Sequence, residues 1–274
     1  MGLTVRTNLS AMSAYNSLNA TQSRLSGTLG RISSGLRVTK AADDAAGLAV
    51  ATKLSARSES LGQAMRNAND GISMIQTAEG STNEVTNILS RMRELAVQSS
   101  SGTLANTERS FINDEFDQLN QEISRIASVT EFNGISLSDG STTTVSAQIG
   151  IDNAATSRID ISLGDLRSTV LGVGALDLST MTGAQSAITA IDTAISTVNT
   201  QRSAYGSVQN RIDSSLSNSA TYMESLKAAE SQIMDADFAK ESTEMTKQQI
   251  MQQAGVAALA QAKNINQAAV SLIS

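Results

Sequence analysis

The chain has 274 residues, a net charge of −6, and no histidine, cysteine, tryptophan or proline. Without histidine or cysteine, the sequence excludes Ser-His-Asp and Cys-His catalytic sites and the usual zinc, haem and iron–sulfur centres, so we expect no cofactor. It also excludes disulfides, and the composition therefore fits oxidising and reducing compartments equally.

The charge pattern argues against nucleic acid and membranes as partners. The 26 acidic and 20 basic residues are spread along the chain, without the Lys/Arg run that follows a phosphate backbone. No stretch approaches the roughly 18 apolar residues of a membrane span. The N-terminal residues also lack the apolar core of a signal peptide, so we expect any secretion to follow a route without a cleavable Sec-type signal.

Apolar residues at alternating spacings of three and four predict a helix in the first segment. The stripe holds seven apolar residues and one glutamine, and we expect the helix to fray at Ser34-Gly35. Its members are Ala11, Tyr15, Leu18, Gln22, Leu25, Leu29, Ile32 and Leu36. The absence of proline lets such helices run on without a built-in stop.

Two further helices follow in the first half. One is predicted from near Ala45 to Ala96, with a single slip of its apolar phase at 75–78, and the Ser/Gly cluster at 99–102 ends it. The next carries apolar residues from Ile112 to Ile126 and stops at a tight turn at Asn133-Gly134.

Alternation of apolar and polar residues predicts a β-hairpin at about 145–163. Residues 164–184 contain four glycines and predict a loop-rich return with short elements at most.

The second half predicts two more helices. One stripe holds its phase from Ile188 to Ile233, which corresponds to a helix about 70 Å long and an elongated molecule. A last helix follows Asp237 and carries apolar residues to Leu272. The predicted fold class is mainly α: an elongated antiparallel coiled-coil or helix-bundle rod with a small β-hairpin and paired N- and C-terminal helices.

The terminal helices indicate self-assembly. Each displays an apolar stripe to its end, but two thin helices bury only one face when they pair, while each ordered residue costs about 1 to 2 kcal/mol of backbone entropy. We therefore expect these helices to be weakly ordered in the monomer and to fold by packing on other copies. The residues predicted to pack there are Leu18, Leu25, Leu29, Ile32, Ala258, Ala262, Ile265 and Leu272.

Four blocks of sequence resemble bacterial flagellin. They are RISSGLRVTKAADDAAGLAVA at 31–51, RMRELAVQSSSGT at 91–103, EFNGISL at 131–137 and QQIMQQAGVAALAQA at 248–262. The resemblance implies a filament subunit of the bacterial flagellum. It also implies an inner-core domain of residues 1–45 and 234–274, and an outer-core rod of residues 46–233 without large variable domains. One departure is Asn264-Ile265-Asn266, where many members carry a proline.

The resemblance also implies partners. Flagellins are exported unfolded through the flagellar type III apparatus, a chaperone holds their C-terminal helical region, here 230–274, and they meet cap and hook-junction proteins. Some are bound by the Toll-like receptor for flagellin, and Arg91, Leu95 and Glu115 stand at matching positions.

Several charged residues have two interpretations. Arg31, Arg37, Lys40, Asp43 and Asp44 form either a solvated connector or an intersubunit cluster, and the resemblance favours the cluster. Arg202 and Glu230 fall on the apolar stripe of the long helix. They act either as polar core residues that specify the helix pairing, as in coiled coils, or as side chains whose aliphatic parts pack while their charged ends stay in water. We favour the second interpretation. The acidic pairs Asp43/Asp44 and Asp235/Asp237 do not form a calcium loop or a metal site.

Three functions compete at this stage: a filament-forming structural protein, a non-polymerising secreted binding module, and an enzyme that uses carboxylates alone. The sequence favours the first, and we expect no catalytic residue.

Overall fold

The computed structural model of the chain describes residues 7–271, and for residues 265–271 it describes the backbone only. It divides into two compact units. Unit 1 comprises residues 1–56 and 225–274, and unit 2 comprises residues 57–224. Both divisions fall inside helices, about ten residues from the domain boundaries predicted at 45/46 and 233/234.

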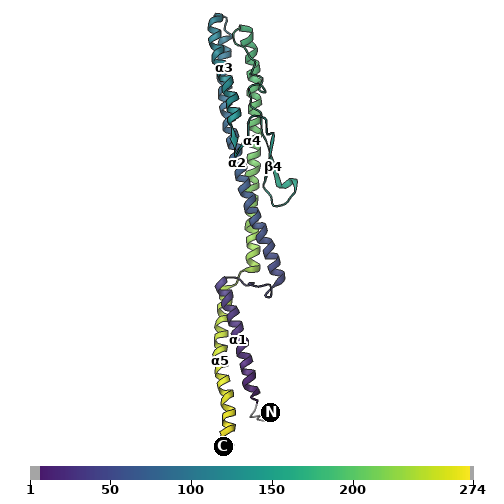
Figure 1. The fold of residues 1–274 in the computed structure, drawn as a ribbon, viewed down its shortest axis with the longest axis vertical. Helices are drawn as coiled ribbons and strands as arrows, with labels where there is room; N and C mark the ends of the chain where they lie inside the picture. Colours follow the sequence, from purple (N-terminus) through teal and green to yellow (C-terminus); the bar gives the residue numbers. More distant parts are fainter. Residues whose placement is uncertain (1–6, 272–274) are drawn as a thin grey trace. The chain divides into compact units, whose positions relative to one another are not determined.

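Unit 1 is built on the helices α1 (Leu9–Ser34) and α5 (Phe238–Ser271), which run side by side in opposite directions (Figure 1). Asn8 caps the start of α1, where its Oδ1 accepts a hydrogen bond of 2.9 Å from the backbone N–H of Ala11. Gly35 ends the helix with φ of 71°, and its N–H donates to the Arg31 carbonyl at 2.8 Å. The left-handed conformation of Gly35 places the helix end where the sequence predicts fraying.

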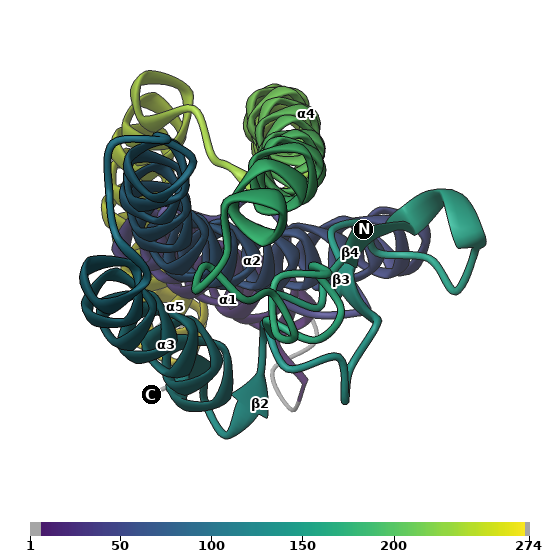
Figure 2. The same ribbon diagram turned by 90° about the horizontal axis from the view of Figure 1, so that it is seen from above.

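Three long helices form most of unit 2. They are α2 (Ala45–Ser99), α3 (Asn106–Val129) and α4 (Met181–Met234), of which α2 begins and α4 ends in unit 1. Figures 1 and 2 show α3 and α4 each running beside α2. The predicted bounds of α2 are confirmed, whereas α4 begins seven residues before the predicted Ile188.

Two small antiparallel hairpins complete unit 2. The predicted one consists of β3 (Thr144–Gln148) and β4 (Arg158–Ser162), joined through the short 3-10 helix η1 (Ala155–Ser157). The other, β1 (Glu131–Phe132) with β2 (Ile135–Ser136), was not predicted as strands. Its two-residue loop is Asn133-Gly134, with φ of 50° and 77°, so the predicted tight turn is a hairpin turn with both residues at positive φ.

The core of unit 2 consists of two apolar clusters. The first joins residues 85–96 of α2, 112–127 of α3, the segment 166–178 and residues 184–198 of α4. The second joins residues 68–78 of α2, the two hairpins and residues 205–216 of α4. Ile75 and Ala78, where the apolar phase slips, are both fully buried and α2 continues through them without a break. The predicted mainly helical fold with paired terminal helices is confirmed.

Candidate assembly surface

A seam of polar contacts joins α1 to α5. Asn8 Nδ2 donates to the Ala262 carbonyl at 2.9 Å, and Gln252 Nε2 donates to Gln22 Oε1 at 2.6 Å. Arg31 Nε lies 3.0 Å from Glu241 Oε1 at the other end of the seam. These contacts span the helix pair and fix its antiparallel register.

The side chains buried along this seam are largely polar. On α1 they are Thr21, Leu25 and Thr28, and on α5 Gln248 and Ala262. The two helices approach closely at Gly255, where an added Cβ would lie 3.3 Å from Leu18 Cδ1. Because hydroxyl and amide groups fill much of the interface, apolar burial between α1 and α5 contributes little to holding the pair together.

Large apolar side chains are exposed on both helices. Leu9 is 70% exposed, Phe238 67% and Ile250 61%. The complete set in α1 and α5, over the described side chains, is Leu9, Met12, Tyr15, Leu29, Phe238, Ile250, Met251 and Val256. So many exposed apolar residues on two thin helices make this pair the candidate assembly surface.

The residues predicted to pack in this unit are divided between seam and surface. Leu25 and Ala262 are buried, Leu18 and Ile32 are half-buried, and Leu29 and Ala258 are exposed. Ile265 lies in α5 without a described side chain, and Leu272 lies outside the described residues. The exposed Phe238 and Ile250 of α5 were not among the predicted residues. Both are apolar residues that lie outside the stripe predicted for this helix.

Backbone contacts close unit 1 where α1 meets the end of α4. Leu36 and Asp235 form an antiparallel bridge, and Ala236 N donates to the Gly35 carbonyl at 2.9 Å. Arg37 caps α4, since its Nη2 donates to the Ile233 carbonyl and its backbone N–H to the Met234 carbonyl, each at 2.6 Å.

The predicted charge cluster is engaged locally within the chain. Asp43 Oδ2 accepts from the backbone N–H groups of Thr39 and Lys40 at 3.1 and 3.0 Å and from the Thr39 hydroxyl at 3.0 Å. The hydrogen bond from the Thr39 backbone is the main reason that the pKa of Asp43 is lowered. Asp44 caps α2 by accepting from Gly47 N at 2.8 Å. Lys40 is exposed.

A second candidate surface lies in unit 2 around Arg91. Its guanidinium donates to Glu115 of α3 at 2.8 and 3.1 Å and to Glu94 at 3.0 Å, and the bonds to Glu115 are the first reason that the pKa of Arg91 is raised. Leu95 lies in the apolar core and is 1% exposed. Of the three residues expected at the receptor positions, Arg91 and Glu115 are thus an exposed ion pair, whereas Leu95 is buried beneath them.

Arg202 and Glu230, the polar members of the α4 stripe, differ in environment. Arg202 is half-buried, and its Nε is buried without a hydrogen-bond partner. Glu230 accepts from Lys227 Nζ at 2.9 Å on the surface.

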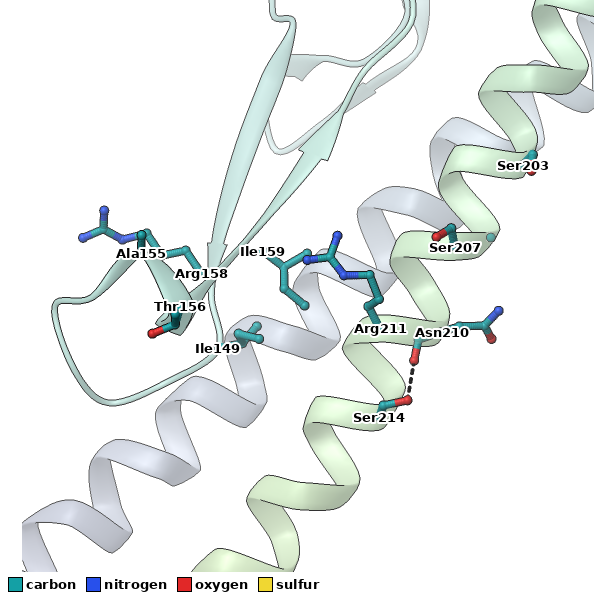
Figure 3. A pocket seen from close by; sticks show the side chains of 11 residues that line it. Ile149, Ala155, Thr156, Arg158, Ile159, Ser203, Ser207, Asn210, Arg211 and Ser214 are labelled. Atoms are coloured by element: carbon teal, nitrogen blue, oxygen red, sulfur yellow. Dashed lines mark hydrogen bonds between the residues drawn. The ribbon is translucent and has the colours of Figure 1, made fainter.

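An open hollow of about 1220 Å³ lies between α4 and the tip of the β3–β4 hairpin (Figure 3). Ile149 and Ile159 line it on the hairpin side, and Ser203, Ser207 and Arg211 on α4. No carboxylate lines this hollow. Among the described residues, no three potential ligands of the His, Cys, Asp or Glu type come together as a metal site.

Asp235 and Asp237 have local roles. Asp235 accepts a hydrogen bond from Ser231, and Asp237 Oδ1 caps α5 by accepting from Ala239 N at 2.9 Å. Over the described part of the chain, no helix combines the length and hydropathy of a membrane span.

Comparison with known families matches most of the chain. The bacterial flagellin N-terminal helical region matches residues 5–143, and the bacterial flagellin C-terminal helical region matches residues 188–273. A flagellin of Halalkalibacterium halodurans is 44% identical over 266 residues, which cover 97% of this chain and 98% of that protein. Polar flagellin C of Vibrio parahaemolyticus is 33% identical over 383 aligned positions that cover both chains fully, so this relative carries segments absent from the 274 residues here.

Solved structures agree with the sequence comparisons. The crystal structure of Bacillus cereus flagellin is 34% identical and superposes with a TM-score of 0.50, covering 56% of this chain and 88% of that one. A putative flagellar hook-associated protein from Vibrio parahaemolyticus shares the fold, with a TM-score of 0.60 at 13% identity over 70% of this chain and 100% of that chain.

Proposed function

Since the chain belongs to the bacterial flagellin family, and is thus a structural, non-enzymatic subunit of the extracellular flagellar filament, we propose that its copies assemble through the exposed apolar side chains of α1 and α5. The eight exposed apolar side chains on these helices support this. Burial of each such side chain contributes about 1.5 to 3 kcal/mol of stabilising free energy, which the isolated α1–α5 pair does not gain because these side chains stay exposed.

The terminal helices complete their folding on assembly. The seam between α1 and α5 buries mainly threonine and glutamine, whereas ordering each residue costs about 1 to 2 kcal/mol of backbone entropy. Packing against neighbouring copies supplies the apolar burial that compensates for this cost. Residues 1–45 and 234–274 then form the inner core of the filament, and residues 46–233 form the outer layer.

The outer layer is compact in this chain. The connection between β4 and α4, residues 163–180, stands between the two halves of the outer layer, where longer family members carry inserted domains. The longer alignment with the Vibrio relative supports a comparatively smooth filament surface here.

The chain reaches the filament unfolded, through the flagellar type III apparatus. The absence of cysteine supports this route, because no disulfide has to be formed or broken. An export chaperone covers residues 230–274, where Phe238, Ile250 and Val256 are exposed before assembly. Cap and hook-junction proteins meet the same terminal helices.

Charges near the helix connections set the register between copies. Arg31, Arg37, Asp43 and Asp44 already make contacts within the chain. These contacts therefore fix the conformation of this segment, while the exposed side chains of Lys40 and Asp43 contact the next copy.

The surface around Arg91 and Glu115 is where the monomer is recognised by the Toll-like receptor for flagellin. Both side chains are exposed, which supports direct contact. Buried Leu95 supports the surface from beneath.

Salt-induced polymerisation of the purified chain, viewed by negative-stain microscopy, tests the assembly surface. We expect I250S/V256S to lose filaments without losing helicity by circular dichroism. The matched control Q249S/Q253S changes exposed polar residues of the same helix and should still polymerise. Filaments from I250S/V256S at the control's concentration would contradict the proposed surface, and a parent protein that stays monomeric even with filament seeds would contradict the proposal as a whole.

A further inference from the structure

In both long helices the two apolar clusters of unit 2 are separated by a short stretch of mostly polar residues, which we call the polar level. On α2 the clusters leave out residues 79–84, Glu-Gly-Ser-Thr-Asn-Glu, none of which is apolar. On α4 they leave out residues 199–204, where Ala204 is the single apolar residue. Apolar packing is therefore interrupted in both helices.

The two interruptions face each other. Arg93 of α2 bonds Asp192 of α4 at 2.6 Å, and on the other side of the gap a Cβ on Gly71 would lie 3.7 Å from Ile212 Cδ1. The antiparallel register between these two anchor points places residues 79–84 beside about 200–205. Both helices thus lack apolar packing at the same level.

Each helix carries a Gly-Ser pair in or next to this level: Gly80-Ser81 lies within the gap on α2, and Gly206-Ser207 lies just past it on α4, directly after Tyr205 of the second cluster. Neither glycine is needed for close packing, because an added Cβ at either position would meet no heavy atom within 4 Å. Gly206 instead lines the hollow shown in Figure 3. Glycine within a helix raises its flexibility, and Gly/Ser pairs are frequent sites of helix bending.

Side-chain hydroxyls add to the local weakening of α2. The Ala78 carbonyl accepts from both the Ser81 hydroxyl at 2.8 Å and the Thr82 hydroxyl at 2.7 Å. Such bonds to the preceding turn compete with backbone hydrogen bonds and bend helices.

The surrounding contacts at this level are also polar. Ser81 bonds the buried Ser138 hydroxyl at 3.2 Å, and Gln201 donates to the Ser162 carbonyl at 2.8 Å. The buried Arg202 Nε has no partner here.

We propose that unit 2 contains an internal joint where the polar level meets the second apolar cluster, at Gly80-Ser81 of α2 and Gly206-Ser207 of α4, and that the two helices open and bend together there. The joint belongs to the single chain and does not depend on assembly. It gives the outer layer a defined position at which to change curvature.

Hydrogen exchange of the purified full chain tests the joint. Amides at 80–84 and 204–209 should exchange at least about tenfold faster than amides at 88–92 and 191–195, since local opening needs less free energy where apolar packing is missing. In G80A/G206A the joint amides should slow by about threefold or more, because alanine favours the helix. The matched control G62A has the same helix preference and meets only Arg66 Nη1, at 3.9 Å, and should leave the joint unchanged.

Three outcomes would overturn the joint: equal protection along α2, no slowing in G80A/G206A, or equal slowing in G62A. Thr82→Val provides an independent variant, since it removes the hydroxyl at nearly constant volume. It should also slow exchange at 80–84, and unchanged exchange there would count against the role of the hydroxyl bonds.

Discussion

Arg91 and Arg93, two residues apart on α2, bind carboxylates on two different helices. Arg91 donates to Glu115 of α3 at 2.8 Å, and Arg93 donates to Asp192 of α4 at 2.6 Å. Residues two apart on a helix point in nearly opposite directions, so one turn of α2 reaches both neighbours. The hydrogen bond from Arg93 also lowers the pKa of the Asp192 carboxyl.

The Arg93–Asp192 pair should show coupling that weakens with salt. Arg93→Gln and Asp192→Asn each lower the thermal midpoint slightly, and the double variant loses less than the sum of the two, because either change alone already breaks the pair. Thermal melts of the four proteins at low and at 1 M NaCl measure this. Because both side chains are exposed, the coupling should fall with salt. Additive effects at low salt would contradict the pairing.

Arg109 should be the most sensitive charged residue of unit 2. It is buried, and its guanidinium donates to the Ser99 and Ser101 carbonyls at 2.9 and 2.7 Å, which closes the end of α2. Arg109→Met removes both bonds, leaving the Ser101 carbonyl only the long bond of 3.4 Å from Leu104 N, and should cost about 2 to 3 kcal/mol of unfolding free energy in urea. Arg109→Lys should recover only part, because lysine lacks the planar fork. A loss below about 0.5 kcal/mol for Arg109→Met would refute this role.

The loop held by Asp43 should open in acid. The pKa of Asp43 is lowered from its ordinary 3.8, chiefly by the Thr39 backbone hydrogen bond, so the charged carboxylate stabilises the folded loop. This contribution is complete above the ordinary value and is lost as pH falls through the lower folded-state value. Amide resonances of Thr39 and Lys40 should therefore titrate below pH 3.8, and Asp43→Asn should remove the titration. A midpoint above 3.8 would contradict the assignment.

Two glycines five residues apart on α1 should respond to alanine with opposite signs. Gly35 has φ of 71°, so Gly35→Ala strains the helix end and costs about 1 to 2 kcal/mol. Gly30 lies inside the helix with nothing near a new Cβ, and Gly30→Ala should stabilise the helix by about 0.5 to 1 kcal/mol. Thermal melts followed by circular dichroism compare them, with Gly35→Asn as the conservative replacement. The same sign for both alanine variants would be inconsistent with the helix end described here.

Removal of residues 260–274 should abolish filaments while unit 2 stays helical. The truncation takes away Ala262, whose carbonyl accepts from Asn8, together with the end of α5. Microscopy and circular dichroism on the same sample report assembly and helicity. Filaments that persist would show that this segment is dispensable.

The helices of unit 2 were predictable because their signals are local. Helix α2 begins at Ala45 and ends at Ser99 as expected, and the alternating residues at 145–163 form β3 and β4. The strands β1 and β2 were missed because each has two residues, too few to show an alternating pattern.

The faces of α1 were only partly predictable. Leu29 of the apolar stripe was expected to pack in the inner core, whereas Thr21 and Thr28 lie in the seam and both Leu29 and Tyr15 of that stripe are exposed. Hydrophobicity identifies side chains that leave water in the assembled state, but it does not tell which of them face a helix of the same chain. The role of Leu29 in assembly stays a prediction.

The contact between Arg37 and Ile233 spans 196 residues of sequence. Closing so long a loop is entropically costly and slow, whereas the hairpins of unit 2 close within a few residues. Unit 1 can therefore form only after nearly the whole chain is available. A chain that emerges from one end first thus keeps α1 without its partner until the last segment follows, so the proposed assembly surface is complete only then.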